Sequence, residues 1–106
     1  MKITAVIAEY NPFHNGHLKQ LKKAKRETGA DALVVVMSGS FTQHGDLCVC
    51  DKYTRASWAI QAGADLVLEL PTVYSLSTAK GFAEFACSAH KIFNKICHIK
   101  LLKCRN

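Results

Sequence analysis

The chain has 106 residues, of which 49% are apolar, and this composition predicts one small, ordered, globular domain. No apolar run reaches the ~18–20 residues that a membrane span needs, and no signal-peptide pattern follows Met1, so we expect a cytoplasmic protein. The net charge is +6, and the acid-free segment 87–106 supplies most of this excess. Such a segment can bind nucleic acid, although a solvated or disordered end is the more frequent structure.

Apolar runs alternate with helical patterns through the first half of the chain. Residues 3–8 form a short, nearly all-apolar run, which is typical of a strand buried on both faces. Residues 17–28 place apolar side chains at helical spacing, with basic residues on the other side, and Gly29 is a suitable stop. Residues 32–37 are rich in β-branched side chains and predict a second buried strand.

The second half repeats this alternation. Asp51 is a good N-cap for a helix that runs to Ala62, and residues 65–70 predict a third strand. The apolar stripe of residues 78–96 predicts a third helix, and residues 97–102 predict a fourth strand. The face of the second helix that we expect to be buried comprises Tyr53, Ala56, Ile60 and either Trp58 or Ala59.

This alternation predicts an α/β fold, because strands separated by helices of this length form parallel βαβ units with right-handed crossovers. We expect a Rossmann-like, doubly wound parallel sheet of three to four strands in the order 3-2-1-4. Residues 1–96 would form the domain, and residues 97–106 would add a fourth strand and a basic tail. In such sheets, ligands bind beyond the carboxyl ends of the strands where the order reverses, which is where the first loop lies.

That loop carries the motif His14-Asn15-Gly16-His17 at the start of the first predicted helix. Gly16 leaves room for a nucleotide to approach the backbone, and a helix N-terminus favours anions. His14 and His17 can donate hydrogen bonds to phosphate oxygens from two sides. Two such donors suit an attack on an α-phosphate that releases pyrophosphate. The structural alternative is a turn with two surface histidines, but the strand-to-helix position favours a phosphate site.

Other polar residues near the predicted strand ends are candidates that also have a structural alternative. Ser38 and Ser40, on either side of Gly39, could reach a substrate or a phosphate, or could belong to a turn of small residues. Lys52 and Arg55 lie one helical step apart and could contact RNA or phosphate, although a solvated helix face is the expected structure. Phe13 could pack beneath the loop or against a ligand, and packing is the expected role. Asp65 and Glu69 are expected to be structural, although Glu69, near the carboxyl end of a strand, could face the site.

The five cysteines do not predict a metal site. Their odd number argues against a disulfide framework and predicts reduced thiols. The spacing of Cys87 and His90 is compatible with zinc, but Cys97 and Cys104 form no tight pair to complete the ligand set. We therefore expect no metal bound by protein side chains alone.

Three segments together resemble one enzyme family. Segments Ala8–His17, Ser38–Phe41 and Glu69–Pro71 are similar to those of the tRNA(Met) cytidine acetate ligases, and the likeness continues to about residue 96. It also includes Val36, Met37, Asp51, Lys52, Arg55 and Gly63–Leu68. These enzymes belong to the superfamily of nucleotidyltransferases with a His-x-Gly-His motif, so the resemblance implies a nucleotidyltransferase-like fold of α/β/α layers. The first segment alone indicates the superfamily, and the other two make the resemblance specific.

The resemblance implies an activity for the whole enzyme. ATP, accompanied by Mg²⁺, would activate acetate as acetyl-adenylate, and the acetyl group would pass to N4 of the wobble cytidine of elongator tRNA(Met). His14 and His17 would contact the triphosphate as catalytic residues. The implied ATP-binding loop comprises Val6, Ile7, Ala8, Glu9, Tyr10, Asn11, Pro12, Phe13, His14, Asn15, Gly16, His17, Leu18, Lys19 and Gln20.

Two other functions stay open at this point. One is an adenylyltransferase for a small molecule, such as a phosphopantetheine or a mononucleotide, within the same superfamily. The other is a fragment without catalysis that binds ATP or RNA.

The chain departs from the family pattern in three places. Segment 43–46 reads Gln-His-Gly-Asp where relatives read Gln-Arg-Gly-Glu, and Cys48 and Cys50 replace apolar residues. Relatives are also much longer and continue into a Phe-Gly-Ser-Glu loop that helps hold the nucleotide. We therefore expect an amino-terminal segment, truncated or from a disrupted reading frame, that lacks the rest of the ATP site and the tRNA-binding region. Its incomplete sheet predicts low stability or self-association through an exposed edge.

Overall fold

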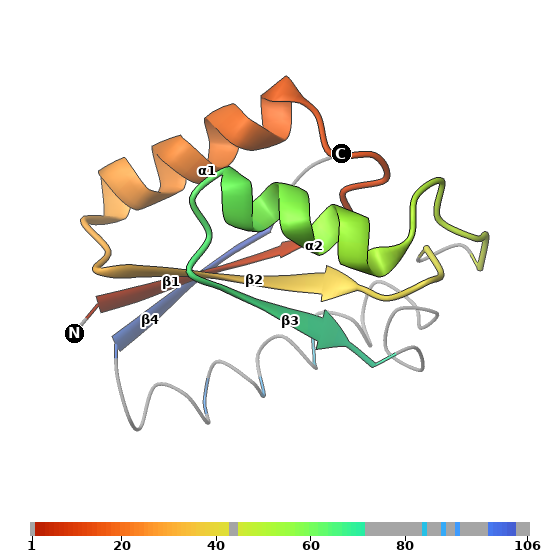
Figure 1. The fold of residues 1–106 in the computed structure, drawn as a ribbon. Helices are drawn as coiled ribbons and strands as arrows, with labels where there is room; N and C mark the ends of the chain where they lie inside the picture. Colours follow the sequence, from red (N-terminus) through yellow and green to blue (C-terminus); the bar gives the residue numbers. More distant parts are fainter. Residues whose placement is uncertain are drawn as a thin grey trace.

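The computed structural model describes residues 2–42, 45–71, 84, 88, 91 and 98–103. Within them, one sheet of four parallel strands carries two helices (Figure 1). In chain order the elements are β1 (Lys2–Ala8), α1 (Asn15–Thr28), β2 (Ala32–Ser38), α2 (Lys52–Gln61), β3 (Leu66–Leu70) and β4 (His98–Lys103). The predicted α/β class is thus confirmed, and the fourth strand exists.

The strand order is β3-β2-β1-β4, which confirms the predicted order. The chain extends the sheet in one direction through β2 and β3, and β4 then pairs with the other side of β1. The order therefore reverses at β1, and the segment that leaves β1 emerges at the reversal point. The ladder between β1 and β2 ends where Ala8 lies opposite Met37.

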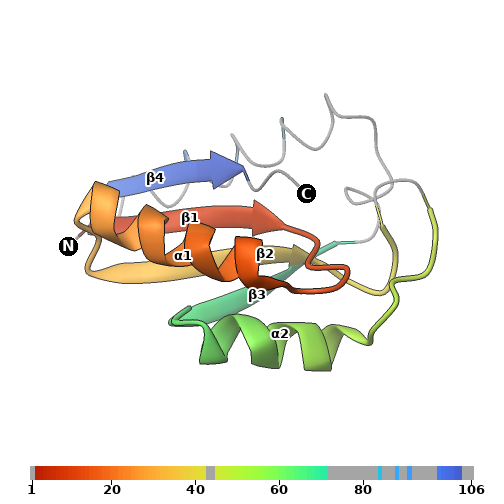
Figure 2. The same ribbon diagram turned by 90° about the horizontal axis from the view of Figure 1, so that it is seen from above.

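The two helices cover the same face of the sheet (Figure 1). Seen from above, α1 runs back across the sheet from the carboxyl end of β1, and α2 lies beside β3 (Figure 2). The predicted helix over 78–96 lies outside the described residues except for Glu84, Ser88 and Lys91, which are helical and exposed. In the described part of the chain, neither helix has the length and apolar content that crossing a bilayer requires.

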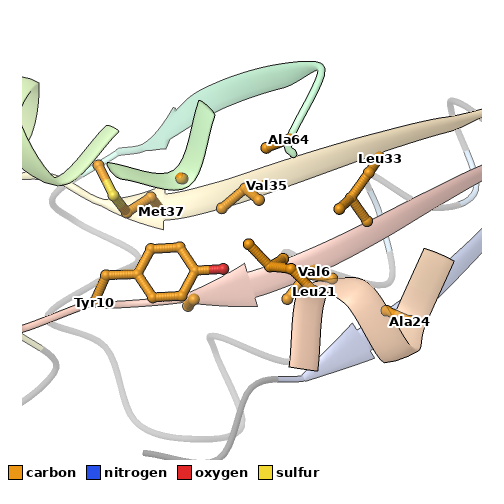
Figure 3. Close-up of a cluster of buried hydrophobic side chains, with 10 residues drawn as sticks. Val6, Tyr10, Leu21, Ala24, Leu33, Val35, Met37 and Ala64 are labelled. Carbon is orange, nitrogen blue, oxygen red and sulfur yellow. The ribbon is translucent and has the colours of Figure 1, made fainter. Parts of the chain in front are cut away.

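The hydrophobic core lies between the sheet and the two helices (Figure 3). Val6 and Val35 from the central strands are fully buried and meet Leu21 of α1, which is 1% exposed. Tyr10 and Met37 extend this cluster toward the carboxyl edge of the sheet. Burial of each large apolar side chain stabilises the fold by about 1.5–3 kcal/mol, so this cluster fixes α1 over β1 and β2.

Both helices begin at a side-chain cap, and α1 begins earlier than predicted. The expected start was residue 17, but α1 starts at Asn15 because His14 acts as its N-cap. Gly29 ends α1 in the left-handed conformation, with φ 61°, as predicted. Asp51 caps α2 as predicted, and its carboxylate accepts a hydrogen bond from the Thr54 backbone N–H at 3.0 Å.

The predicted buried face of α2 is wrong in two positions. Tyr53 is 78% exposed and Ile60 is 47% exposed. The residues that face the sheet are Arg55 and Ala59, one helical turn apart, and both are completely buried. The helix is therefore rotated so that a charged side chain, and not an aromatic one, enters the interior.

Candidate functional site

The loop after β1 folds back sharply over the end of the sheet. Tyr10 has a positive φ of 52° and is completely buried, which is unusual for a bulky residue. The Asn11–Pro12 peptide bond is cis. This loop leads from the carboxyl end of β1 into the N-terminus of α1 (Figure 2).

Aromatic contacts hold the motif histidines in place. The Tyr10 ring lies edge-to-face against Phe13, at 4.8 Å between ring centroids, and against His17, at 4.9 Å. Phe13 therefore packs beneath the loop, as expected. The imidazoles of His14 and His17 are stacked, with their centroids 3.7 Å apart and their planes 25° apart. His17 is only 3% exposed, whereas His14 is exposed.

Backbone hydrogen bonds fix the tautomer of each imidazole. The Gly16 N–H donates to Nδ1 of His14 at 3.0 Å, and the His14 N–H donates to Nδ1 of His17 at 3.2 Å. A ring nitrogen that accepts a hydrogen bond carries no proton, so each neutral imidazole carries its proton on Nε2. Both rings therefore use Nδ1 to cap the helix and carry their proton on Nε2. The ring of His14 is exposed, whereas Nε2 of His17 is buried in this structure.

Gly16 is required by the His14 ring itself. A Cβ atom on residue 16 would lie 2.9 Å from Cε1 and 3.0 Å from Nδ1 of His14, so an added methyl group would force this ring to shift. The room that glycine leaves beside the backbone is thus occupied by an imidazole. Within the motif, the absence of a side chain at Gly16 allows the His14 ring to lie against the backbone of residue 16.

The segment after β2 lies at the same edge of the sheet. Ser38 and Gly39 are buried, and Ser40 is exposed. A Cβ atom on residue 39 would lie 2.5 Å from Oε1 of Glu69, so the glycine lets this carboxylate approach. Lys52 donates to both oxygens of Glu69, at 3.0 and 3.1 Å, and this contact raises the pKa of Lys52. Lys52, on a face of α2, therefore joins this helix to β3 through its ion pair with Glu69.

Arg55 contradicts the expectation of a solvated helix face. It is 0% exposed, and its guanidinium donates to the carbonyl oxygens of Cys50, Glu9, Ser38 and Gly39. These carbonyls already bind the donors that a phosphate contact would need. Arg55 therefore connects the ends of β1 and β2 to the start of α2 inside the protein. The sequence pattern did not predict this connection.

The predicted site residues thus gather at one edge of the sheet. The first residues of the implied ATP-binding loop are buried in β1, and its last residues lie in the first turns of α1, where Lys19 is exposed. Asp65 has the expected structural role, since its carboxylate accepts a hydrogen bond from the Leu33 N–H at 2.8 Å. His44 lies outside the described residues.

The described cysteines and acids do not form a metal-binding cluster. Cys48 and Cys50 are free thiols, and among the residues described no group of three His, Cys, Asp or Glu side chains could hold an ion. Burial raises the pKa of the Cys48 thiol, although the nearby charge of Arg55 opposes this effect. The zinc alternative built on Cys87 and Cys97 falls on residues outside the described part.

The comparisons with known proteins agree with this geometry. The model of the HIGH Nucleotidyl Transferase family matches residues 1–101. Over 100 residues, the chain is 51% identical to a tRNA(Met) cytidine acetate ligase of Clostridium botulinum (strain Hall) and 54% identical to that of Clostridium tetani. Each match covers 92% of this chain, and 24% and 25% of the respective relative. The chain therefore spans about a quarter of the length of these relatives.

A solved structure supports the same relationship. Thermotoga maritima TmcAL, crystallised with alpha-thio ATP, superposes with a TM-score of 0.86 at 42% sequence identity. The match covers 95% of this chain and 24% of that one. Because the family model covers nearly the whole sequence and the fold agrees, the chain belongs to the HIGH nucleotidyl transferase family.

Proposed function

We propose that this chain binds ATP at the His14–His17 motif. The observation that supports the proposal is the pair of stacked imidazoles at the N-terminus of α1, each with its proton assigned to Nε2. Two Nε2–H donors and the positive end of a helix dipole suit an anion with several oxygens, such as a triphosphate. The motif lies where the strand order reverses, which is the usual ligand position in such sheets.

We further propose that the whole protein activates acetate as acetyl-adenylate. An acetate oxygen would attack the α-phosphorus, the bond from that phosphorus to the bridging oxygen would break, and pyrophosphate would leave with the electron pair. Donors at His14 and His17 would stabilise the negative charge that develops on the phosphate oxygens. The acetyl group would then pass to N4 of the wobble cytidine of elongator tRNA(Met), with release of AMP.

The relatives support the choice of substrates. The Clostridium proteins are tRNA(Met) cytidine acetate ligases by name, and the Thermotoga protein was crystallised with an ATP analogue. Mg²⁺ would enter with the triphosphate, because this ion keeps several waters and is usually held by substrate phosphates and one or two carboxylates. A tRNA substrate would put the reaction in the cytoplasm. Self-association through a sheet edge stays a prediction.

The test is acetate-dependent exchange of labelled pyrophosphate into ATP. The proposal predicts exchange by the wild-type chain, or by the longest form of this protein that its gene encodes. In His17→Ala the exchange rate should fall about a hundredfold or more, because the variant lacks a donor to the developing charge. Lys23→Ala is the control, because Lys23 is exposed on α1 and its ion-pair partner among the described residues is Glu27, at 3.7 Å. Circular dichroism verifies that each variant is folded.

The outcomes separate the possible functions. Exchange that requires acetate, followed by acetylation of a tRNA(Met) transcript, supports the proposal. Exchange that requires a phosphopantetheine or a mononucleotide instead of acetate would identify a small-molecule adenylyltransferase. ATP binding without any exchange, even in the longest natural form, would contradict the proposed activation of acetate.

A further inference from the structure

The guanidinium of Arg55 lies where the next backbone pairing between β1 and β2 would be. The ladder between β1 and β2 ends at Ala8 opposite Met37, and the following residues on the two strands are Glu9 and Ser38. Nη1 of Arg55 donates to the carbonyl oxygens of both, at 2.8 Å to Glu9 and 3.1 Å to Ser38. The guanidinium therefore joins the two strand ends at the point where their direct pairing stops.

The same guanidinium joins these strand ends to α2. Nη2 donates to the carbonyl oxygen of Gly39, and Nε donates to the carbonyl oxygen of Cys50 at 3.0 Å, just before the helix cap. The ion pairs found among the described residues involve other side chains, so carbonyl oxygens are the partners of this buried charge. Such a group is tolerated in the interior only when its donors are satisfied in a defined geometry.

A short series of contacts leads from Arg55 to the motif. Glu9 is followed directly by Tyr10, whose buried ring lies against His17 with 4.9 Å between centroids. A second contact fixes the same loop, since Oδ1 of Asn11 accepts a hydrogen bond from the Val49 N–H at 2.6 Å. The loop is thus held at Glu9 by Arg55 of α2 and at Asn11 by Val49, which precedes α2.

We propose that Arg55 is a positioning residue for the phosphate site. It sets the separation of the ends of β1 and β2, and through Glu9 and Tyr10 it fixes the imidazole of His17 without touching the ligand. Lysine cannot replace it, because a single ammonium group lacks the planar, forked set of donors that reaches these carbonyls. The effect on ATP rests on the proposed ATP-binding function, whereas the effect on the imidazole does not.

The test compares Arg55→Lys with Ala59→Gly. Ala59 lies one turn further along α2 and is equally buried in the core, but its methyl side chain makes no hydrogen bond to the carbonyls at the strand ends. Its variant therefore destabilises the same helix without removing a hydrogen bond to Glu9, Ser38 or Gly39. Both variants are studied at low temperature in sucrose, which favours the folded state. Long-range ¹H–¹⁵N spectra report the tautomer and environment of each imidazole, and calorimetry gives the dissociation constant for ATP.

We expect Arg55→Lys to shift the His17 ring resonances and to weaken ATP binding by between about ten- and a hundredfold, as a misplaced donor does. Ala59→Gly should leave the resonances in place and change the dissociation constant by less than about twofold. Tyr10→Leu should reproduce the shift of the His17 resonances, and the double variant Tyr10→Leu/Arg55→Lys should add little to it.

Two results are distinguishable. If Arg55→Lys and Ala59→Gly give the same imidazole spectra, Arg55 is only a structural residue and the inference fails. If the wild-type chain does not bind ATP, the proposed function fails, while the spectra still decide the positioning role.

Discussion

At the scale of single residues, His14 combines two roles that proteins usually separate. Helix caps are normally Ser, Thr, Asp or Asn, whose side-chain oxygen accepts a backbone N–H. Here Nδ1 of an imidazole does this at 3.0 Å, and the same hydrogen bond leaves the proton on Nε2. The cap therefore prepares the ring as a donor, so stability and ligand binding share one side chain.

Substitution of His14 can separate these two roles. His14→Ser keeps an oxygen that can cap α1, so the free energy of unfolding should stay within about 0.5 kcal/mol of wild type. Its ATP affinity should fall by roughly ten- to a hundredfold, because one hydrogen bond to a charged group contributes about 1.5–3 kcal/mol. His14→Ala should lose the same affinity and about 1 kcal/mol of stability as well.

Urea unfolding and ATP calorimetry on the two His14 variants provide the measurement. If His14→Ser bound ATP as tightly as wild type, the Nε2–H of residue 14 would not be a phosphate donor. If both variants were equally destabilised, the ring would contribute to stability through something other than the cap.

The sequence predicted the place of the two histidines, but it did not predict that Arg55 is buried. A strand, a loop and a helix start are local patterns, so the position of the His14–His17 motif could be predicted. Arg55 and Lys52 looked alike in the sequence because both occur at helical spacing beside polar neighbours. What distinguishes them is a set of carbonyls supplied by distant segments, as far away as Glu9, and no local pattern encodes that convergence.

At the scale of elements, α2 shows how one buried charge orients a helix. Turning Arg55 and Ala59 toward the sheet places Tyr53 and Ile60 at the surface. Hydrophobicity alone favours the opposite rotation, which is why the predicted face was wrong at these two positions. The cap at Asp51 was predictable, since capping depends on residues only three positions apart.

The cap of α2 predicts a pH dependence of stability. Hydrogen bonds from the Thr54 hydroxyl and backbone N–H hold the pKa of Asp51 below its ordinary value of 3.8. Because the folded pKa is the lower one, this stabilisation is present above pH 3.8 and is lost as pH falls through the folded pKa. Asp51→Asn keeps a capping oxygen but does not titrate, so its stability should fall less steeply in acid than that of wild type.

Urea unfolding of both chains between pH 2 and pH 6 measures the difference. The other carboxylates titrate equally in the two chains and cancel in the comparison. Parallel stability curves would show that Asp51 does not contribute to the acid dependence.

At the scale of the whole molecule, the alternation of strands and helices was enough to predict the sheet. Buried parallel strands are continuous apolar runs, and right-handed crossovers leave few possible orders, so β3-β2-β1-β4 followed from the pattern. Element ends were harder, because they depend on individual caps such as His14. The helix predicted over 78–96 would cover the second face of a doubly wound sheet. Both features stay predictions, because this segment lies largely outside the described residues.

The most direct test of the account is the melting temperature of the wild-type chain and of Gly16→Ala at rising ATP concentration. A ligand at about 100 times its dissociation constant stabilises the folded state by about 2.7 kcal/mol, or roughly 10–20 °C for a domain of this size. We predict this rise for wild type and its loss in Gly16→Ala, whose added methyl group would displace the His14 ring. A melting temperature that does not respond to millimolar ATP, or that rises equally in both chains, would contradict a nucleotide site built on this motif.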